Sequence, residues 1–258
     1  MNNTTEGNNQ YDHDFWGELR RFTDARIALG HTGVSLPTDE CLRFTHAHAQ
    51  ARDAVHLPLD KELMKKELAE IGVDVVEVHS DAKDRQTFLK RPDLGRRLNS
   101  ASRSKLQKLA AEAPDVVFVI GDGLSSKAVH RQAVPLLKET LPYLDQLNLS
   151  VAPIILAEQS RVALGDEIAQ ILNAKLVAML IGERPGLSSP DSLGIYLTYN
   201  PCVGRLDSER NCISNVRPEG LTHEKAAFKM AWLIQSAFSL RQTGIALKDE
   251  SDLGLLMG

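Results

Sequence analysis

The sequence is poor in cysteine and in long apolar runs, and it carries no excess of positive charge. Its three cysteines, at positions 41, 202 and 212, include no Cys-x-x-Cys pair, and no His/Cys cluster has zinc spacing; this argues against a disulfide framework and a zinc site. No stretch approaches the roughly 18 apolar residues of a membrane span. The formal net charge is −4, which disfavours binding to nucleic acid. We therefore expect a cytoplasmic protein without a metal site, and bound neither to membrane nor to nucleic acid.

The first fourteen residues, MNNTTEGNNQYDHD, are polar. They lack the charged-then-apolar pattern of a secretory signal, and we expect residues 1–12 to be a disordered lead. Apolar residues at helical spacing then predict helices over 14–30, 39–55 and 60–71. Gly30 and Gly72 are typical stop signals, and Thr38 is a typical N-cap. Because these helices precede any strand, residues 13–72 are predicted to form an N-terminal helical subdomain.

From residue 73 onward, apolar strands alternate with helices. Strands are expected over 73–78, 116–120, 151–156, 176–181 and 193–198. Helices are expected over 100–112, from Ser125 or Ser126 onward, and over 136–147, 165–173 and 222–243. Near-continuous apolar strands separated by helices predict an α/β fold, a Rossmann-like, mostly parallel sheet with helices on both faces, over 73–258. Pro153 suggests that its strand lies at an edge or carries a bulge.

Three segments fall at the carboxyl ends of strands, where ligands bind in open parallel sheets. Residues 121–126 (GDGLSS) form either a tight capped turn or a nucleotide site, although the third glycine of Gly-x-Gly-x-x-Gly is missing. Residues 182–186 (GERPG) offer Glu183 as a hydrogen-bond acceptor for a ligand or, equally, as one half of a solvated pair with Arg184. The connection over 199–220 is long, and its apolar content favours an ordered binding loop over disorder.

No acid–base–nucleophile set accompanies these segments. Cys212 has no base close to it in the sequence, which disfavours a nucleophilic role. His46 and His48 are two residues apart in a predicted helix, so they face different directions and cannot hold one metal ion. The residues alone predict a protein with a ligand- or partner-binding edge and no self-sufficient active site.

Eight segments, in order along nearly the whole chain, resemble the small (light) subunit of ethanolamine ammonia-lyase. They are residues 19–30 (LRRFTDARIALG), 35–44 (SLPTDECLRF), 46–53 (HAHAQARD), 91–98 (RPDLGRRL), 119–125 (VIGDGLS), 182–187 (GERPGL), 196–201 (YLTYNP) and 209–216 (ERNCISNV). The resemblance implies an adenosylcobalamin-dependent lyase that converts ethanolamine to acetaldehyde and ammonia by a radical mechanism. It also implies a large-subunit partner, a TIM barrel with the substrate site, in a hetero-oligomer of six copies of each subunit.

The resemblance further implies that this chain closes over the cobalamin and supplies no catalytic residue. Three positions match the family's cobalamin contacts: Val162 in QSRV, Glu183 in GERPG and Cys212 in RNCISN. We expect Glu183 to accept a hydrogen bond from a corrin amide, and Val162 and Cys212 to act through backbone groups and apolar contact. The N-terminus shows no encapsulation helix, so location in a bacterial microcompartment stays open. The alternatives are a stand-alone Rossmann-like nucleotide-binding protein and a cobalamin-binding interaction protein.

Overall fold

The chain divides into two compact units, residues 1–50 and 51–258. The computed structural model describes residue 18 and residues 20–23, 25–110 and 113–252. The predicted disordered lead, residues 1–12, lies outside these residues. In the first unit, a short 3-10 turn, η1 (Arg20–Phe22), precedes helix α2 (Thr38–His56), which continues into the second unit. Helix α2 confirms the helix predicted over 39–55.

The helix predicted over 14–30 is wrong over residues 25–30, which are irregular; residues 14–17, 19 and 24 lie outside the described part. An amphipathic helix gains most of its stability by burying its apolar face. Here Phe22 is 85% exposed, and no described residue of the first unit is buried. Large apolar residues exposed in this unit are Phe22, Ile27, Val34, Leu36, Leu42 and Phe44. The apolar side chains of this unit thus have no core of their own among the described residues.

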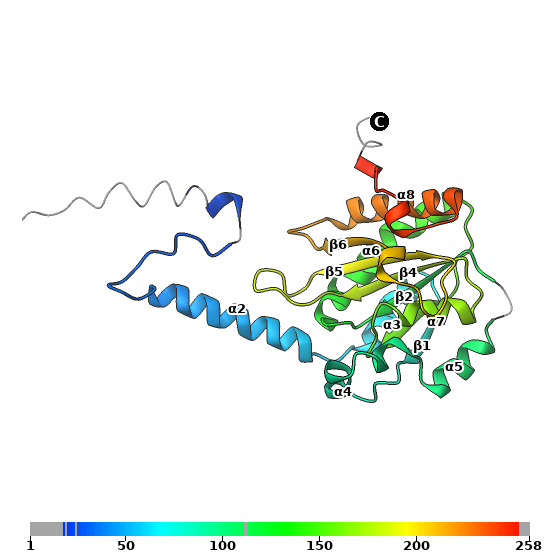
Figure 1. The fold of residues 1–258 in the computed structure, drawn as a ribbon, viewed down its shortest axis with the longest axis horizontal. Coiled ribbons are helices and arrows are strands. Elements are labelled where there is room, and N and C mark those ends of the chain that lie inside the picture. Colours follow the sequence, from blue (N-terminus) through cyan, green and yellow to red (C-terminus); the bar gives the residue numbers. More distant parts are fainter. Residues whose placement is uncertain (1–17, 19, 24, 111–112, 253–258) are drawn as a thin grey trace, which may run out of the picture. The chain divides into compact units, whose positions relative to one another are not determined.

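The second unit contains a six-stranded sheet with the order β1-β3-β2-β4-β5-β6 (Figure 1). The strands are β1 (Val75–His79), β2 (Val116–Gly121), β3 (Ile154–Glu158), β4 (Leu176–Gly182), β5 (Leu193–Tyr199) and β6 (Asn211–Val216). Strands β1 to β4 are parallel, whereas β5 is antiparallel to β4 and β6 is antiparallel to β5. The predicted mostly parallel α/β sheet is confirmed.

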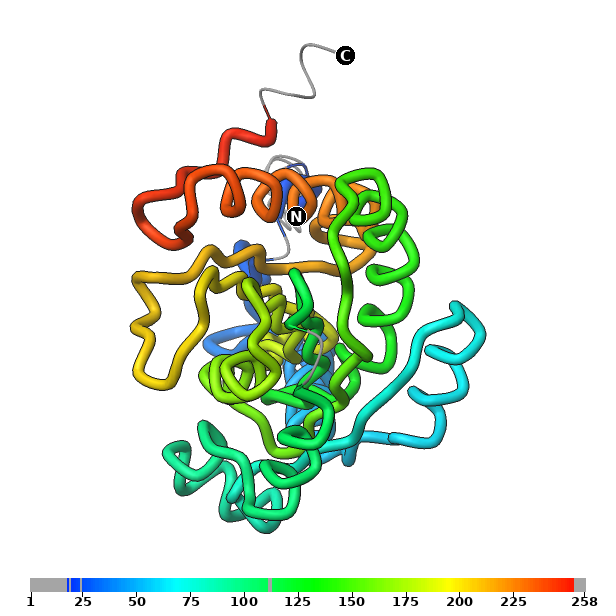
Figure 2. The backbone as a smooth tube through the Cα atoms, turned by 90° about the vertical axis from the view of Figure 1, so that its right-hand side faces the viewer, coloured from blue at the N-terminus to red at the C-terminus, as the bar shows by residue number. Residues whose placement is uncertain are grey.

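Helices cover both faces of this sheet. Helices α3 (Lys61–Glu70), α6 (Ser126–Gln146) and α8 (His223–Leu240) cover one face, α5 (Ser100–Gln107) and α7 (Leu164–Ile171) cover the other, and α4 (Arg85–Lys90) follows β1. Side chains alternate along β2, so that Phe118 lies in the first core and Val119 in the second. Figure 2 shows α6 and α8 side by side along one side of the sheet.

The two faces differ at the β5–β6 end. Ile195 of β5 and Ile213 of β6 are buried in the core beneath α6 and α8. On the opposite face, α7 packs against β4, and the second core contains no buried side chain from β5 or β6. There Tyr196 is half-buried and Cys212 is exposed. We call this part of the surface the open face, defined by Gly194 and Tyr196 of β5 and Cys212 of β6.

Three local expectations need correction. Pro153 does not mark an edge strand: it precedes β3, which lies between β1 and β2, so the proline takes no ladder position inside the strand. The two helices predicted after Ser125 are one helix, α6, with Pro135 and Pro142 inside it. The connection over 199–220 is ordered but not structureless, because β6 occupies its second half.

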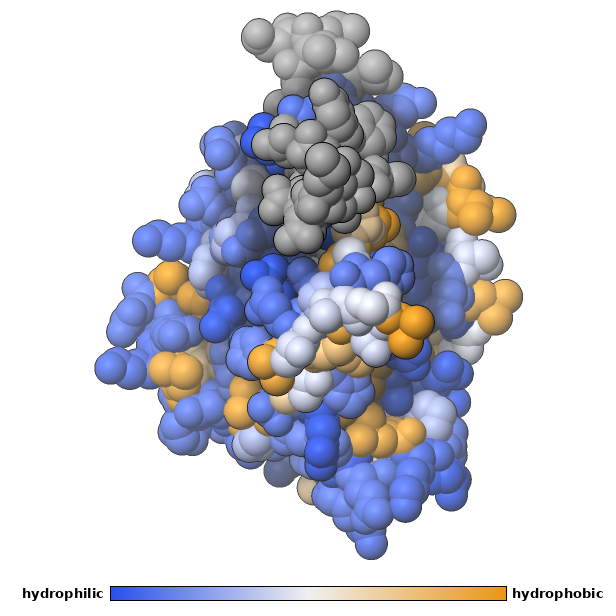
Figure 3. Space-filling view, turned by 90° about the vertical axis from the view of Figure 1, so that its left-hand side faces the viewer, coloured by the Kyte–Doolittle hydropathy of each residue, from blue (hydrophilic) through white to orange (hydrophobic). Residues whose placement is uncertain are grey.

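Helix α3 belongs to the main core rather than to a separate helical layer. Its residues Met64 and Leu68 are fully buried in the core that α6 and α8 cover. The other limits of the predicted division, a helical subdomain over 13–72 and a cofactor-contacting domain over 73–258, stay predictions. None of the helices in the described part of the chain combines the length and apolar character needed to cross a membrane. On the face that Figure 3 shows, apolar residues form separate groups among hydrophilic ones.

Candidate functional site

The carboxyl edge of the parallel strands brings the first two predicted segments together. The backbone N–H of Leu124 donates to the carbonyl oxygen of Gly182 at 2.9 Å. A Cβ atom on Gly182 would lie 2.1 Å from the carbonyl oxygen of Ser125, and one on Gly121 would lie 2.2 Å from Ser160 Oγ. Gly182 therefore allows backbone-to-backbone packing between the turns that follow β2 and β4, and Gly121 allows the side chain of Ser160, after β3, to approach the end of β2.

This packing argues against a nucleotide site in the 121–126 turn. Ser125 caps α6, as the sequence predicts, because its Oγ accepts from the N–H of Ala128 at 3.2 Å. The same hydroxyl donates to the carbonyl oxygen of Pro190 at 2.9 Å, and Gln132 of α6 donates to the carbonyl oxygen of Asp191. The 190–191 segment therefore lies against the first turns of α6, where a phosphate would have to bind. The capped-turn interpretation is the one that the geometry favours.

Asp122 is a buried carboxylate within this turn that sequence reasoning did not single out. It is 2% exposed and accepts hydrogen bonds from the backbone N–H groups of Gln159 and Ser160, both at 2.9 Å. Arg85 Nη1 lies 3.5 Å from Asp122 Oδ2. Burial raises the pKa of Asp122 despite these partners. Its contacts join the turn after β2 to the turn after β3, which is a positioning role rather than a catalytic one.

Glu183, the predicted acceptor, is held at the end of β4 by neighbours just before β5 and in β6. Its carboxylate accepts a hydrogen bond from the Ser192 hydroxyl and a longer one from the N–H of Asn215 at 3.3 Å. Gly194 makes room for it, because a Cβ atom there would lie 3.0 Å from Glu183 Oε1 and 3.1 Å from Cγ. The alternative interpretation, a solvated pair with Arg184, finds no ion pair between these two side chains in the described residues. Glu183 is thus positioned by contacts across the sheet.

Cys212 lies on the open face beside Glu183 and Tyr196. Tyr196 and Cys212 are register partners on β5 and β6. Cys212 is exposed; partial desolvation nonetheless raises its pKa, with a further increase from the charge of Glu183. Burial likewise raises the pKa of Tyr196. A thiol that stays protonated is a poor nucleophile, which agrees with the sequence argument.

Val162 lies after β3, at the entrance to α7. It is half-buried and packs against the second core, as Tyr196 does, and its carbonyl oxygen accepts from the N–H of Gly165 at 3.0 Å. The three predicted residues therefore lie on the side of the sheet that α7 partly covers. Glu183 and Cys212 both lie beside Tyr196. Val162 lies just before the first residue of α7. What any of them binds stays a prediction.

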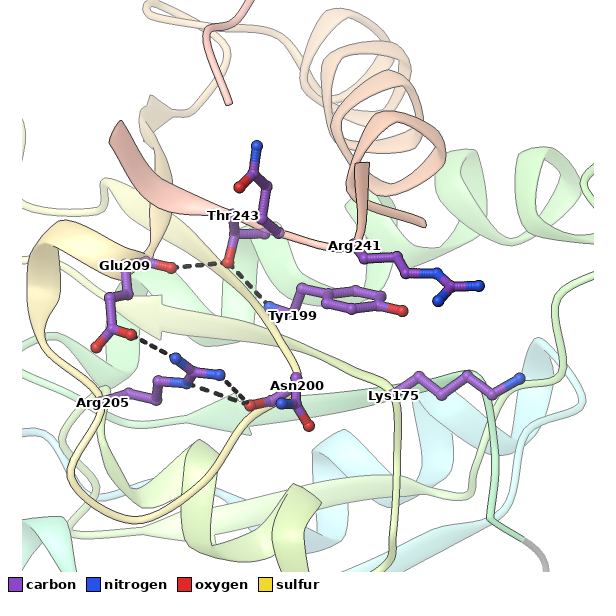
Figure 4. Close-up of a pocket in the computed structure, with 8 residues that line it drawn as sticks. Lys175, Tyr199, Asn200, Arg205, Glu209, Arg241 and Thr243 are labelled. Carbon is purple, nitrogen blue, oxygen red and sulfur yellow. Dashed lines mark hydrogen bonds and ion pairs between the residues drawn. The ribbon is translucent and has the colours of Figure 1, made fainter. Parts of the chain in front are cut away.

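A hollow lies at the opposite edge of the sheet, where β4 begins and β5 ends (Figure 4). It has a volume of about 500 Å³ and is lined by Lys175, Tyr199, Asn200, Arg205, Glu209, Arg241, Gln242 and Thr243. Its polar groups largely pair with one another or with adjacent residues. Arg205 pairs with Glu209 and donates to the carbonyl oxygen of Asn200, while Lys175 lies 2.7 Å from Asp115. Thr243, after α8, accepts from the N–H of Tyr199 at 2.9 Å and donates to the carbonyl oxygen of Glu209 at 2.7 Å. These contacts attach the segment after α8 to β5, so we assign the hollow a structural role.

Comparisons with known proteins decide the family. The sequence profile of the ethanolamine ammonia-lyase light chain family (EutC) matches residues 13–248. The chain belongs to this family. Among named relatives, the "Ethanolamine ammonia-lyase small subunit" of Pseudomonas fluorescens (strain Pf0-1) is 52% identical over 244 residues, covering 93% of this chain and 89% of the relative. The small subunit of Azotobacter vinelandii is 51% identical over 246 residues, covering 94% and 91%.

A third relative, from Rhodopseudomonas palustris (strain BisA53), carries the same name and is 50% identical over 236 residues, covering 92% of this chain and 90% of the relative. The resemblance seen in the eight sequence segments is therefore confirmed as membership of the ethanolamine ammonia-lyase light chain family. Within that family, the described residues of this chain contain no group of three or more His, Cys, Asp or Glu side chains placed to hold a metal ion.

Proposed function

We propose that this chain is the cofactor-holding subunit of an adenosylcobalamin-dependent ethanolamine ammonia-lyase. The observation that carries the proposal is the family match over residues 13–248. The reaction is the deamination of ethanolamine to acetaldehyde and ammonia. When bound, adenosylcobalamin would supply the radical that starts it. This chain would contribute one wall of the corrinoid site, through Val162, Glu183 and Cys212.

The residues present suit a corrinoid. A corrin ring is broad, largely apolar and bordered by amide side chains. The open face offers an extended surface with the ring of Tyr196 and the protonated thiol of Cys212. Glu183 adds a carboxylate acceptor that is already oriented by Ser192 and Asn215. A prepositioned acceptor loses little conformational freedom when an amide N–H binds to it.

A partner must complete the site. The described residues show no nucleophile–base pair beside the open face, and the thiol of Cys212 has a raised pKa. From the resemblance to the family, we assign the substrate pocket and the catalytic groups to a large subunit with a TIM-barrel fold, in an assembly of six copies of each subunit. The first unit, whose apolar side chains are exposed, is a second surface for contact with that subunit. Cytoplasmic location stays part of the proposal, and delivery to a microcompartment stays open.

Co-expression with the large subunit tests the proposal. We expect acetaldehyde release only when both subunits and adenosylcobalamin are present. In the purified complex, Glu183→Gln should weaken cobalamin binding about tenfold, because the hydrogen bond would lose its charged acceptor. Glu70→Gln, at an exposed position on α3, is the matched control and should bind normally. Activity from this chain alone, or equal binding by both variants, would contradict the proposed roles.

A further inference from the structure

Four arginines belong to segments that follow the parallel strands at their carboxyl ends. Arg85 lies in α4, Arg96 in the 3-10 turn η2 (Leu94–Arg96), and Arg161 and Arg184 follow β3 and β4. The side chain of Arg161 is within electrostatic reach of the other three: burial, followed by their like charges, lowers the pKa of Arg161. We call these four residues the arginine cluster.

Phe88 holds two members of the cluster in place. The Cζ atoms of Arg85 and Arg161 lie 4.8 and 4.2 Å from the centroid of its ring, within cation–π range. Gly95 lets Arg161 approach closely, since a Cβ atom there would lie 3.0 Å from both Arg161 Cγ and Phe88 Cδ2. The backbone N–H of Arg161 also donates to the Gly95 carbonyl oxygen at 2.8 Å. The two guanidinium groups are therefore arranged by the fold itself.

The positive charge of the cluster exceeds the negative charge that faces it. Asp122 interacts with Arg85 at 3.5 Å but is already occupied by the backbone N–H groups described above. Arg96, Arg161 and Arg184 form no ion pair with a carboxylate of the described residues, and Arg85 Nη2 and Arg161 Nε have no hydrogen-bond partner there. Crowded like charges are unfavourable unless an anion lies among them.

We propose that the arginine cluster binds a phosphate-class anion. Guanidinium groups present planar N–H pairs that match the oxygens of phosphate esters. Two sources carry this chemistry: the phosphodiester of the nucleotide loop of cobalamin, and free inorganic phosphate. The first source rests on the proposed function, since Arg161 and Arg184 adjoin Val162 and Glu183 in the sequence. The second does not depend on it.

The test uses the complex with the large subunit and three variants. Arg161→Met removes a fixed guanidinium, Arg184→Gln removes an exposed one, and Arg97→Gln is the control at an exposed arginine outside the cluster. Binding of cobalamin and of cobinamide, which lacks the phosphodiester, is measured by absorption titration. Binding of inorganic phosphate is measured by calorimetry. We expect Arg161→Met and Arg184→Gln to weaken anion binding about tenfold or more, and Arg97→Gln to leave it unchanged.

The two sources give different results. Weaker binding of cobalamin with unchanged binding of cobinamide assigns the cluster to the phosphodiester. Saturable phosphate binding that both cluster variants weaken, with cobalamin affinity unchanged, assigns it to free phosphate. The inference is overturned if the cluster variants bind cobalamin, cobinamide and phosphate as the control does. Because Arg161→Met could disturb packing on Phe88, Arg184→Gln must show the same trend. Failure of the wild-type complex to bind cobalamin would refute the proposed function instead, and the phosphate measurement would still test the cluster.

Discussion

Replacement of Gly194 by alanine should displace the carboxylate of Glu183 while leaving the sheet folded. The added Cβ atom would lie 3.0 Å from Glu183 Oε1, 3.1 Å from Glu183 Cγ and 3.3 Å from Tyr196 Cε2. All three neighbours are side-chain atoms, and the Glu183 side chain can rotate away more readily than the backbone can shift. Alanine also loses less conformational entropy than glycine in a strand, by about 0.5–1 kcal/mol. We therefore expect little change in melting temperature.

The expected loss of cobalamin affinity follows from the contacts of Glu183. Rotation of the carboxylate would remove the hydrogen bond from the Ser192 hydroxyl and the 3.3 Å contact with the N–H of Asn215. An acceptor without this support must be ordered again when the ligand binds. A hydrogen bond to a charged group contributes about 1.5–3 kcal/mol. Loss of one such bond to the ligand corresponds to affinity reduced by about tenfold to 100-fold.

A double-mutant cycle separates this mechanism from a general disturbance of β5. Cobalamin dissociation constants are compared for the wild-type complex, Gly194→Ala, Glu183→Gln and the double variant. If Gly194 acts through Glu183, the double variant should bind about as weakly as Glu183→Gln alone. Fully additive losses would refute the reasoning, as would a Gly194→Ala complex with wild-type affinity beside a weakened Glu183→Gln complex.

Three further predictions concern stability. Arg210→Met should lower the free energy of unfolding by about 3–5 kcal/mol, because it leaves the carboxylate of Asp166, whose side chain is 1% exposed, without its partner. Urea unfolding measures this change, and a loss under about 1 kcal/mol would contradict the prediction. Burial lowers the pKa of His130 from 6.5, and its Nε2 accepts a backbone N–H at 2.9 Å. The unfolded chain therefore binds the extra proton first, and stability falls as the pH falls through 6.5 toward the lowered pKa. His130→Gln, which keeps an acceptor but does not titrate, should reduce that fall in melting temperature, and an equal fall in both proteins would oppose this account. Gly182→Ala should give little soluble protein, since the added Cβ atom would lie 2.1 Å from the backbone oxygen of Ser125. Soluble expression at the wild-type level would show that the turn after β2 can shift to accept the methyl group.

The buried strands could be predicted because they are nearly continuous apolar runs. Strand β4, for example, is buried along its whole length, and its sequence has no competing interpretation. Strand β6 is different, since only Ile213 and Val216 are buried in a polar stretch. Its hydrophobic residues do not alternate as a strand requires, so the sequence alone indicates a loop, and the strand is recognised only from its pairing with β5. The prediction divided α6 at Pro135 for a related reason: local preference indicates a break there, which tertiary packing overrides.

The candidate site was predictable only where one segment carries the signal. Glu183 could be found because it directly follows an apolar strand. The residues that orient it, Ser192 and Gly194, become neighbours through the antiparallel register of β4 and β5, in which Gly182 pairs with Leu193. Arg85 and Arg161 likewise meet over Phe88 from segments far apart in the chain. Such contacts depend on the order of the strands in the sheet, which the hydrophobic periodicity of the sequence does not reveal.

The reversal of direction at β5 brings one short connection back to the edge of the sheet that it left. Residues 183–192 leave the sheet after β4 and return to it at the same edge, because Gly182 and Leu193 are register partners. Insertions or deletions between those two anchor points would alter the rim beside Glu183 while every strand kept its pairing. Exchange of this connection between relatives is therefore a direct way to alter what the rim accepts without redesigning the fold.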